Sequence, residues 1–198
     1  MNFYISDLHF GHANVIRHDE RPFADVGEMD AAMMERWNAA VGKDDDVYVV
    51  GDFCYRSGRT ADWYLRRLAG RKHLIVGNHD WLTLRNPKAV AMFASVDSIL
   101  EIEDGGRLVV LCHYPLAEWR NLLRGSWHVY GHIHNKRNAT WAFMRTFPHA
   151  LNAAAPLNGY APVPFDRLVE NNLANNAGAP LPATDLEESP ENAKKNRK

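Results

Sequence analysis

Five short apolar runs in this 198-residue chain each lead into residues with carboxylate, imidazole or amide side chains. The runs cover residues 3–5, 47–50, 74–76, 108–111 and 127–130. The polar residues that follow them are Asp7 and His9, then Asp52, then Asn78, His79 and Asp80, then His113, and finally His132 and His134. In open α/β sheets, functional groups gather just beyond the carboxyl ends of the strands. The sequence therefore predicts five strands that deliver these side chains to one site.

The spacing inside these segments supports a shared site. Residues two apart in an extended chain point to the same side, so we expect Asp7 and His9 to reach one point in space. The same reasoning applies to His132 and His134. A glycine precedes the polar residues in three of the segments, where a missing side chain permits a sharp turn and a close approach. These glycines are Gly51, Gly77 and Gly131.

The chemistry of these side chains indicates metal binding. Imidazole, carboxylate and amide donors favour Mn, Fe, Co, Ni or Zn over the ions of a thiolate site. Any one of these residues alone is more often a cap or a satisfied polar group, but their joint occurrence favours ligation. The seven candidate ligands are Asp7, His9, Asp52, Asn78, His113, His132 and His134. Seven are too many for one tetrahedral zinc, whereas two ions bridged by one carboxylate would use them all.

Between the apolar runs the chain carries helix and turn signals. Asp25 and Glu28 form a capping pair ahead of apolar residues that recur every four positions up to residue 41. Further helices are predicted over 60–70 and from Asn86, where a proline follows the cap. A hairpin is predicted over 98–112. Strands alternating with helices, with some hairpins, predict an α/β architecture built on mixed sheets.

The composition changes towards the C-terminal end. The length suits one compact domain with a tail. Seven of the ten prolines lie between Pro148 and Pro190, and the chain after Glu170 is rich in Asn, Ala and Pro. Such a stretch cannot bury enough apolar surface to offset its ordering entropy. We therefore expect one domain over residues 1–169 and a mobile C-terminal tail over 170–198.

Charge and hydropathy exclude several classes of protein. The 23 Lys and Arg residues balance 24 acidic residues, which argues against a bulk electrostatic clamp for duplex nucleic acid or for a membrane surface. The longest apolar run, 89–94, is far short of the roughly 20 residues that a membrane span needs. Two cysteines make no disulfide framework, and no secretion signal precedes the first strand. We therefore expect a cytoplasmic protein.

The ordered motifs resemble those of the calcineurin-like metallophosphoesterase superfamily. That pattern is D-x-H, G-D, G-N-H-D/E, H and G-H-x-H, and all five blocks occur here in order over roughly residues 3–165. The segments around Gly11 and over 21–23 are similar to a small, single-domain bacterial and phage branch. The resemblance implies a four-layer α/β/β/α sandwich of two mixed sheets flanked by helices.

The resemblance also implies a role for each site residue. One metal ion would take Asp7, His9, Asp52 and His134, and the other would take Asp52, Asn78, His113 and His132. Asp52 would bridge the ions, and a hydroxide shared by them would be the nucleophile. His79 would be the catalytic residue that faces the leaving-group oxygen. Two divalent transition-metal ions are implied, Mn first, with Fe, Zn, Co or Ni as alternatives.

Two departures from the family pattern bear on the substrate. Members that dephosphorylate proteins or cleave dinucleoside polyphosphates carry Asp-Arg-Gly after the G-D motif and Glu after G-N-H. Here Phe53, Cys54 and Tyr55 follow Asp52, and Asp80 stands at the Glu position. These departures argue against a protein phosphatase and leave the partner that orients His79 open.

The sequence thus predicts a phosphoesterase that hydrolyses a phosphodiester, nucleotide-like in character, by in-line attack of the bridging hydroxide. A phosphatase acting on monoesters of a nucleotide or protein, a nuclease and a non-catalytic metal-binding scaffold remain as alternatives. Substrate contacts are expected from Arg56, Arg59, His12, Asn14 and Arg17, although the first two could be solvated loop residues. Four other histidines are expected at the surface or in packing: His18, His73, His128 and His149. The oligomeric state stays open.

Overall fold

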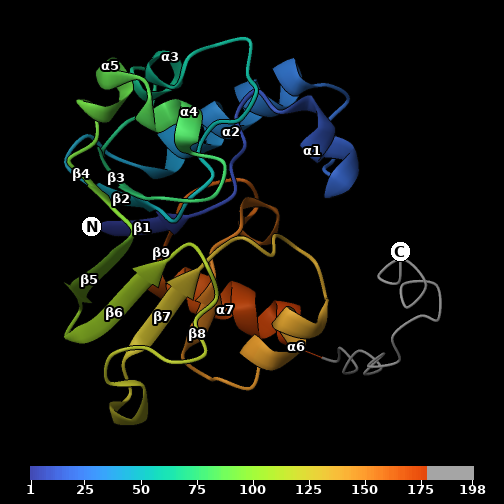
Figure 1. Ribbon diagram of the computed structural model, residues 1–198. Coiled ribbons are helices and arrows are strands. Elements are labelled where there is room, and N and C mark those ends of the chain that lie inside the picture. Colours follow the sequence, from blue (N-terminus) through green and yellow to red (C-terminus); the bar gives the residue numbers. More distant parts are fainter. Residues whose placement is uncertain (178–198) are drawn as a thin grey trace, which may run out of the picture.

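The computed structural model describes residues 1–177, which form two mixed β-sheets flanked by helices (Figure 1). The first sheet has the strand order β4-β3-β2-β1-β9, in which β9 alone is antiparallel to its neighbour. Its strands are β1 (Asn2–Ile5), β2 (Asp46–Val49), β3 (Arg71–Ile75), β4 (Ser95–Asp97) and β9 (Val163–Pro164).

The second sheet has the order β5-β6-β7-β8, with β5 antiparallel to β6 and the other pairs parallel. Its strands are β5 (Ile99–Asp104), β6 (Arg107–Cys112), β7 (Trp127–Tyr130) and β8 (Ala150–Asn152). All five predicted strands are therefore confirmed, and the predicted hairpin is the β5–β6 pair. The parallel strands of both sheets end at the same edge of the molecule, which is where the candidate ligands follow.

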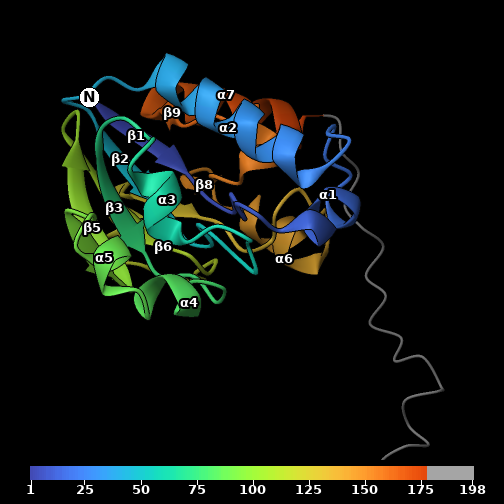
Figure 2. The same ribbon diagram turned by 90° about the horizontal axis from the view of Figure 1, so that it is seen from above.

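The helices and short 3₁₀ turns lie mostly outside the sheets. The helices are α1 (Ala13–His18), α2 (Val26–Ala40), α3 (Ala61–Leu65), α4 (Trp81–Leu84), α5 (Pro87–Val90), α6 (Ala139–Met144) and α7 (Phe165–Asn176). The 3₁₀ turns are η1 (Leu122–Arg124) and η2 (Ala155–Asn158). Figure 2 shows α2 and α3 on the side of the first sheet that faces the viewer, with α2 running alongside β1. Within the described residues, no helix is both long enough and apolar enough to cross a bilayer.

Strand residues alternate between two apolar cores, which explains the layers. Phe3 and Ile5 face the helices α2, α3 and α5, whereas Tyr4 between them faces the second sheet. A third core joins α6 to the outer face of the second sheet through Trp141 and Met144. The order is thus helices, sheet, sheet, helix, as expected from the resemblance.

Two helix predictions meet different outcomes. Helix α2 is confirmed: Asp25 accepts a hydrogen bond from the Glu28 backbone N–H, and the Glu28 carboxylate accepts one from Ala24. The helix predicted over 60–70 ends at Leu65 instead. Beyond it, the Asn38 side chain accepts from the N–H of Ala69 and donates to the backbone carbonyl of Arg67. That amide satisfies backbone groups that a longer helix would have paired internally.

The expected domain boundary after residue 169 is wrong, because α7 continues to Asn176. Its Asn172 side chain accepts from the Asn152 backbone N–H and donates to the Asn152 carbonyl. An asparagine that looked like part of a polar tail therefore docks the helix onto the edge strand β8. The remainder of the expected tail, 178–198, lies outside the described residues.

Candidate metal centre

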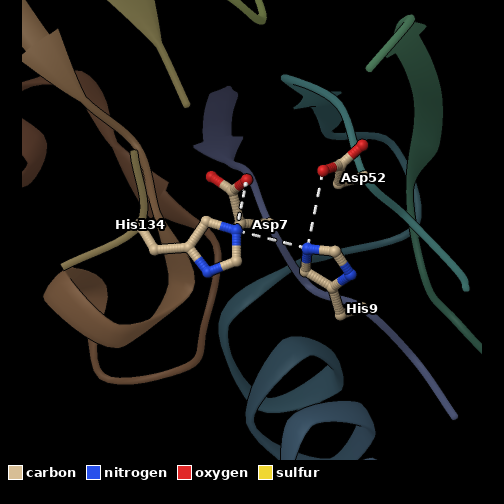
Figure 3. A group of neighbouring side chains, drawn as sticks. All are labelled: Asp7, His9, Asp52 and His134. Carbon is tan, nitrogen blue, oxygen red and sulfur yellow. Dashed lines mark hydrogen bonds and ion pairs between the residues drawn. The ribbon is translucent and has the colours of Figure 1, made fainter. Parts of the chain in front are cut away.

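Four of the expected ligands converge in one cluster, formed by Asp7, His9, Asp52 and His134 (Figure 3). The Nε2 atom of His134 lies 3.4 Å from Oδ1 of Asp7 and 3.3 Å from Nε2 of His9. The same His9 nitrogen lies 3.5 Å from Oδ2 of Asp52. These side chains follow β1, β2 and β7, so the cluster joins both sheets. It could hold one metal ion.

The other expected ligands form a second group beside the first. Oδ1 of Asn78 lies 3.1 Å from Nε2 of His113 and 2.9 Å from Nδ1 of His132. Nε2 of His113 also lies 3.6 Å from Oδ2 of Asp52. One oxygen of Asp52 therefore faces imidazoles of both groups. The structure brings all seven expected ligands together.

Two of the candidate imidazole ligands form hydrogen bonds through the ring nitrogen that points away from the cluster, and these bonds show whether the other nitrogen can bind a cation. Nδ1 of His113 lies 2.9 Å from the Val50 carbonyl oxygen, which accepts its proton, so Nε2 presents a lone pair to Asp52. Nδ1 of His134 likewise donates to Asp19 at 2.7 Å, so in the neutral ring, the form that binds metal, the Nε2 lone pair faces Asp7. Lone pairs that face carboxylate oxygens repel each other unless a cation lies between them. The donor set therefore fits metal ions.

The backbone of the cluster is held in a sparsely populated conformation. Five of the seven candidate ligands have φ between 51° and 70°, in the left-handed region: Asp7, His9, Asp52, His132 and His134. Such residues cost of the order of 1 kcal/mol or more each and gather at functional sites. Asp7 and His9 therefore converge through left-handed bends, and the expected reason, alternation along an extended strand, is wrong.

All three predicted glycines allow a close approach, since a Cβ atom on Gly51 would lie 2.1 Å from Nδ1 of His113. A Cβ atom on Gly77 would lie 2.4 Å from Oδ1 of Asp52, and one on Gly131 would lie 2.7 Å from Oδ2 of Asp7. All three distances are far inside van der Waals contact. A side chain at any of these positions would displace a candidate ligand.

The electrostatic surroundings keep two of the imidazoles neutral. Burial, followed by the charge of His134, places the pKa of His9 well below its ordinary value. Burial also lowers the pKa of His132. For His134, burial alone would lower the pKa, but the hydrogen bond to Asp19 raises it. His9 and His132 are thus deprotonated near pH 7, the state that binds metal.

Asp19 and Arg21 form a buried pair behind the cluster that sequence reasoning missed. Arg21 donates to Oδ2 of Asp19 at 3.0 Å through Nη2 and to the backbone carbonyls of Asp7 and Leu8 at 2.8 and 2.9 Å. Both side chains are fully buried. Burial alone would raise the pKa of Asp19, but hydrogen bonds from His134 and His18 hold it below its ordinary value. This ion pair fixes the backbone that carries Asp7 and the ring of His134.

Asp80 also has a role that the motif did not reveal. Its carboxylate accepts hydrogen bonds from the backbone N–H groups of Gly77, Asp52 and Phe53, at 2.8 to 2.9 Å. Burial raises the pKa of Asp80 to about 6, against the opposing effect of these bonds. Asp80 therefore joins the two loops that carry Asp52 and Asn78.

His79 lies beside the cluster and lines the same cavity. Its ring centroid is 5.2 Å from that of His9 and 4.2 Å from that of Tyr55. Its backbone N–H donates to Oδ1 of Asp52 at 2.8 Å. Sequence reasoning missed the aromatic contact with Tyr55, which packs against the His79 ring.

The cavity over the cluster has a volume of about 580 Å³. Of the expected substrate contacts, His12 and Asn14 line it, and burial lowers the pKa of His12. Arg56 and Arg59 line a different pocket, and Arg17 is an exposed residue of α1 that lines neither. The residues that line the cavity without having been expected there include His18, Tyr114 and Lys136.

Similar proteins come from an archaeon, a phage and a bacterium. The protein MJ1445 of Methanocaldococcus jannaschii is 29% identical over 170 residues, which cover 85% of this chain and 89% of that protein. The gene 66 protein of Mycobacterium phage L5 is 30% identical, covering 67% of this chain and 77% of that protein. The crystal structure of AQ665 from Aquifex aeolicus superposes with a TM-score of 0.64 at 25% identity, over 82% of this chain and 94% of that one.

The family match covers the strands and loops that form the cluster. Residues 3–154 match the calcineurin-like phosphoesterase family, and this range includes every candidate ligand. The fold, two mixed sheets flanked by helices, agrees with that match. The chain therefore belongs to the calcineurin-like phosphoesterase family.

Proposed function

We propose that this protein is a dinuclear, metal-dependent hydrolase of phosphodiesters. The family implies a phosphate-ester substrate and divalent metal ions. The observation that carries the dinuclear proposal is the position of Asp52, whose Oδ2 atom faces His9 at 3.5 Å and His113 at 3.6 Å. That oxygen is the one that would bridge two ions.

The ligand sets follow from the two groups of side chains. One ion would be held by Asp7, His9, Asp52 and His134, and the other by Asp52, Asn78, His113 and His132. When bound, two such ions lower the pKa of water towards about 7 and neutralise charge on a phosphate. The mixed oxygen and nitrogen donors favour Mn, with Fe, Zn, Co or Ni as alternatives.

The other residues of the cavity would bind the substrate and move a proton. His79 would give a proton to the departing oxygen, because it lies next to the cluster and opens to the cavity. His12 and Asn14, on the wall of the cavity, would contact the phosphate or its substituents.

A diester, rather than a monoester, is supported by aromatic rings at two places around the cluster. The Tyr55 ring lies 4.2 Å from His79, whereas the Tyr114 ring lies 4.7 Å from His132. Tyr114 lines the cavity and is 46% exposed. The exposed Tyr114 ring suits an organic substituent of the phosphate on the His132 side, and Tyr55, which contacts His79 but does not line the cavity, adds apolar surface on the other side. A cytoplasmic location completes the proposal, since Cys54 and Cys112 are free thiols.

The test compares hydrolysis of bis(4-nitrophenyl) phosphate with that of 4-nitrophenyl phosphate by the Mn-loaded protein. We expect a higher kcat/KM for the diester. A higher value for the monoester would instead establish a phosphomonoesterase. If the protein binds two metal ions per chain yet hydrolyses neither ester nor a single-stranded oligonucleotide, the scaffold alternative holds and the proposal is wrong.

A further inference from the structure

A second pocket lies beside the candidate metal centre, between residues 54–61 and the helices α4 and α5. Its volume is about 240 Å³, and Arg56, Arg59, Thr60 and Thr83 are among its lining residues. Within residues 1–177, it shares no lining residue with the cavity over the cluster. The two arginines expected to contact the substrate are therefore gathered in a space of their own.

The positive charge of this pocket is not neutralised by the protein. In the described part of the chain, neither guanidinium forms a hydrogen bond or an ion pair; Arg56 lies over the Tyr55 ring at 5.2 Å and Arg59 over Trp63 at 4.8 Å. The nearby Asp62 carboxylate is instead bound by Arg66 at 3.3 Å and by the Asn86 amide at 2.8 Å. Two guanidinium groups on one small pocket favour an anion between them.

A buried hydroxyl in the same pocket lacks a partner. Thr83 is 1% exposed, and its Oγ1 atom has no hydrogen-bond partner among the described residues. A buried hydroxyl without a partner costs of the order of 1–3 kcal/mol and calls for an explanation. An anion held by the arginines would accept a hydrogen bond from this hydroxyl. Guanidinium and hydroxyl donors together are the groups that bind phosphate.

The pocket lies on the His79 side of the candidate metal centre. The Tyr55 ring is close to both, since its centroid lies 5.2 Å from the Arg56 guanidinium carbon and 4.2 Å from the centroid of the His79 ring. Helix α4, which carries Thr83, begins directly after Asp80. A substrate whose leaving group extends past His79 and Tyr55 would thus reach this pocket.

The segment that carries the arginines is held in place by the fold. The Tyr55 backbone N–H donates to the Phe10 carbonyl at 3.2 Å. The Ser57 hydroxyl is hydrogen-bonded to the Tyr64 hydroxyl at 2.8 Å, and Tyr64 donates to Asp30 at 2.7 Å. The backbone that carries the two arginines is therefore fixed before a ligand binds, so that only their exposed side chains have to be ordered.

The sequence around the pocket is strongly basic although the whole chain is not. Between residues 56 and 88 lie eight of the 23 Lys and Arg residues but only two of the 24 acidic residues, Asp62 and Asp80. The overall net charge of −1 conceals this local excess. Part of this excess does not act at the pocket, because Arg71 and Lys72 lie at the start of β3 and Arg71 is paired with Asp46 at 2.8 Å. The charge that a ligand of the pocket would meet is that of Arg56 and Arg59.

We propose that the pocket binds a second phosphate group of the substrate, on the leaving-group side of the scissile ester. This inference rests on the proposed phosphodiesterase function and narrows its substrate class. The substrate is a phosphodiester whose departing part carries another phosphate, as in a nucleotide chain. Arg56 and Arg59 bind that phosphate, and Thr83 donates the third hydrogen bond.

The experiment uses three thymidine dinucleotides with the Mn-loaded protein: one without a terminal phosphate, one with a 5′-phosphate and one with a 3′-phosphate. We expect one terminally phosphorylated form to have a kcat/KM at least about tenfold above the unphosphorylated form, the effect of a charge-assisted contact. In R56Q/R59Q this ratio falls towards one. The matched control R66Q/R85Q removes two arginines from the same face that do not line the pocket, and it keeps the ratio.

Two results would overturn the inference: a ratio near one in the wild-type protein, or equal losses of the ratio in the two double variants. The second would indicate a diffuse field in place of a pocket. If the protein hydrolyses neither the dinucleotides nor bis(4-nitrophenyl) phosphate, the proposed function itself has failed. Binding of the same dinucleotides, measured by calorimetry, then tests the pocket separately. Tighter binding of a phosphorylated form, lost in R56Q/R59Q, supports the pocket. Equal binding of all three dinucleotides rejects it.

Discussion

The two sheets supply chemically different halves of the candidate metal centre. The first sheet provides both carboxylates, Asp7 and Asp52, together with His9 and Asn78, whereas the second sheet provides imidazoles alone. The first half therefore carries all of the ligand set's negative charge, which would offset part of the charge of two divalent cations. The second half contributes neutral donors. Loss of a residue should consequently cost more in the first half than in the second.

Each half is also positioned by the other. His134 follows the second sheet but donates to Asp19 from the first half, and His113 donates to the Val50 carbonyl of the first half. In return, the His132 backbone N–H donates to Asp7 at 3.1 Å. The site can therefore form only when the two sheets have packed against each other.

Asp52→Asn should have the largest effect, because it removes charge from the oxygen shared by both ligand groups. We expect hydrolysis to fall to the rate without enzyme and bound metal to fall below one ion per chain, measured by elemental analysis. The matched change in the second half, His132→Asn, should weaken metal binding less than Asp52→Asn does, because it replaces one neutral donor with another and leaves the charge of the site unchanged. Equal metal loss in both variants would contradict the difference between the halves.

His79→Ala should separate catalysis from metal binding. Because its ring lies beside the cluster without being one of the seven candidate ligands, we expect both ions to remain bound. Hydrolysis of bis(4-nitrophenyl) phosphate should fall by about 10²–10⁴-fold, the range of a general acid. A variant that lost metal as readily as Asp52→Asn would show that His79 belongs to the ligand set instead.

The candidate ligands could be predicted from the sequence, whereas the side chains that connect the two halves of the site could not. The ligands lie in short motifs directly after strands, so their convergence follows from the topology of parallel sheets. Asp19 contacts His134 across 115 positions of the chain, a distance over which no local pattern operates. The docking of α7 through Asn172 was missed for the same reason. A polar side chain is buried when it finds a backbone hydrogen-bond partner, and here that partner lies on a distant strand.

Asp19→Asn should weaken the contact between the two halves of the site, because Asp19 bonds His134 of the second half. The variant leaves the Arg21 guanidinium buried without its counter-charge and weakens the bond that orients His134. We expect an affinity for Mn lower by about 10–100-fold, measured by titration. The control is Asp30→Asn, a carboxylate that bonds Gly11 and Tyr64 and lies outside the cluster, and it should keep the affinity.

The stability of the Asp19 variant should depend on pH in a defined direction. Hydrogen bonds from His134 and His18 hold the pKa of Asp19 below its ordinary value of 3.8, despite burial. A carboxyl group of this kind stabilises the fold above that ordinary value and ceases to do so as the pH falls through its lower, folded-state pKa. The gap in unfolding free energy between wild type and Asp19→Asn should thus persist down to about pH 4 and then narrow. A gap that closed between pH 7 and 5 would exclude this role.

His128→Gln should have the smallest effect on the site, although His128 lies on the same strand, β7, that leads to His132 and His134. Its Nδ1 donates to the Val110 carbonyl at 3.0 Å and its Nε2 accepts from the Leu116 N–H at 3.1 Å, so the ring is a neutral packing residue, as expected from the sequence. Activity at pH 7.5 and metal content should match wild type.

The unfolding free energy of this variant, by contrast, should depend less on pH than that of the wild type. Burial lowers the pKa of His128 to about 4, so the unfolded chain binds a proton that the folded chain does not between pH 6.5 and about 4. Wild-type stability should therefore fall as the pH falls through this window, by up to about 3 kcal/mol from this residue. Urea unfolding at pH 7.5, 6.0 and 4.5 should show a smaller fall in unfolding free energy for His128→Gln than for wild type. Metal release at low pH affects both proteins alike and does not change this difference. Parallel declines would mean that protonation of the buried His128 does not destabilise the fold.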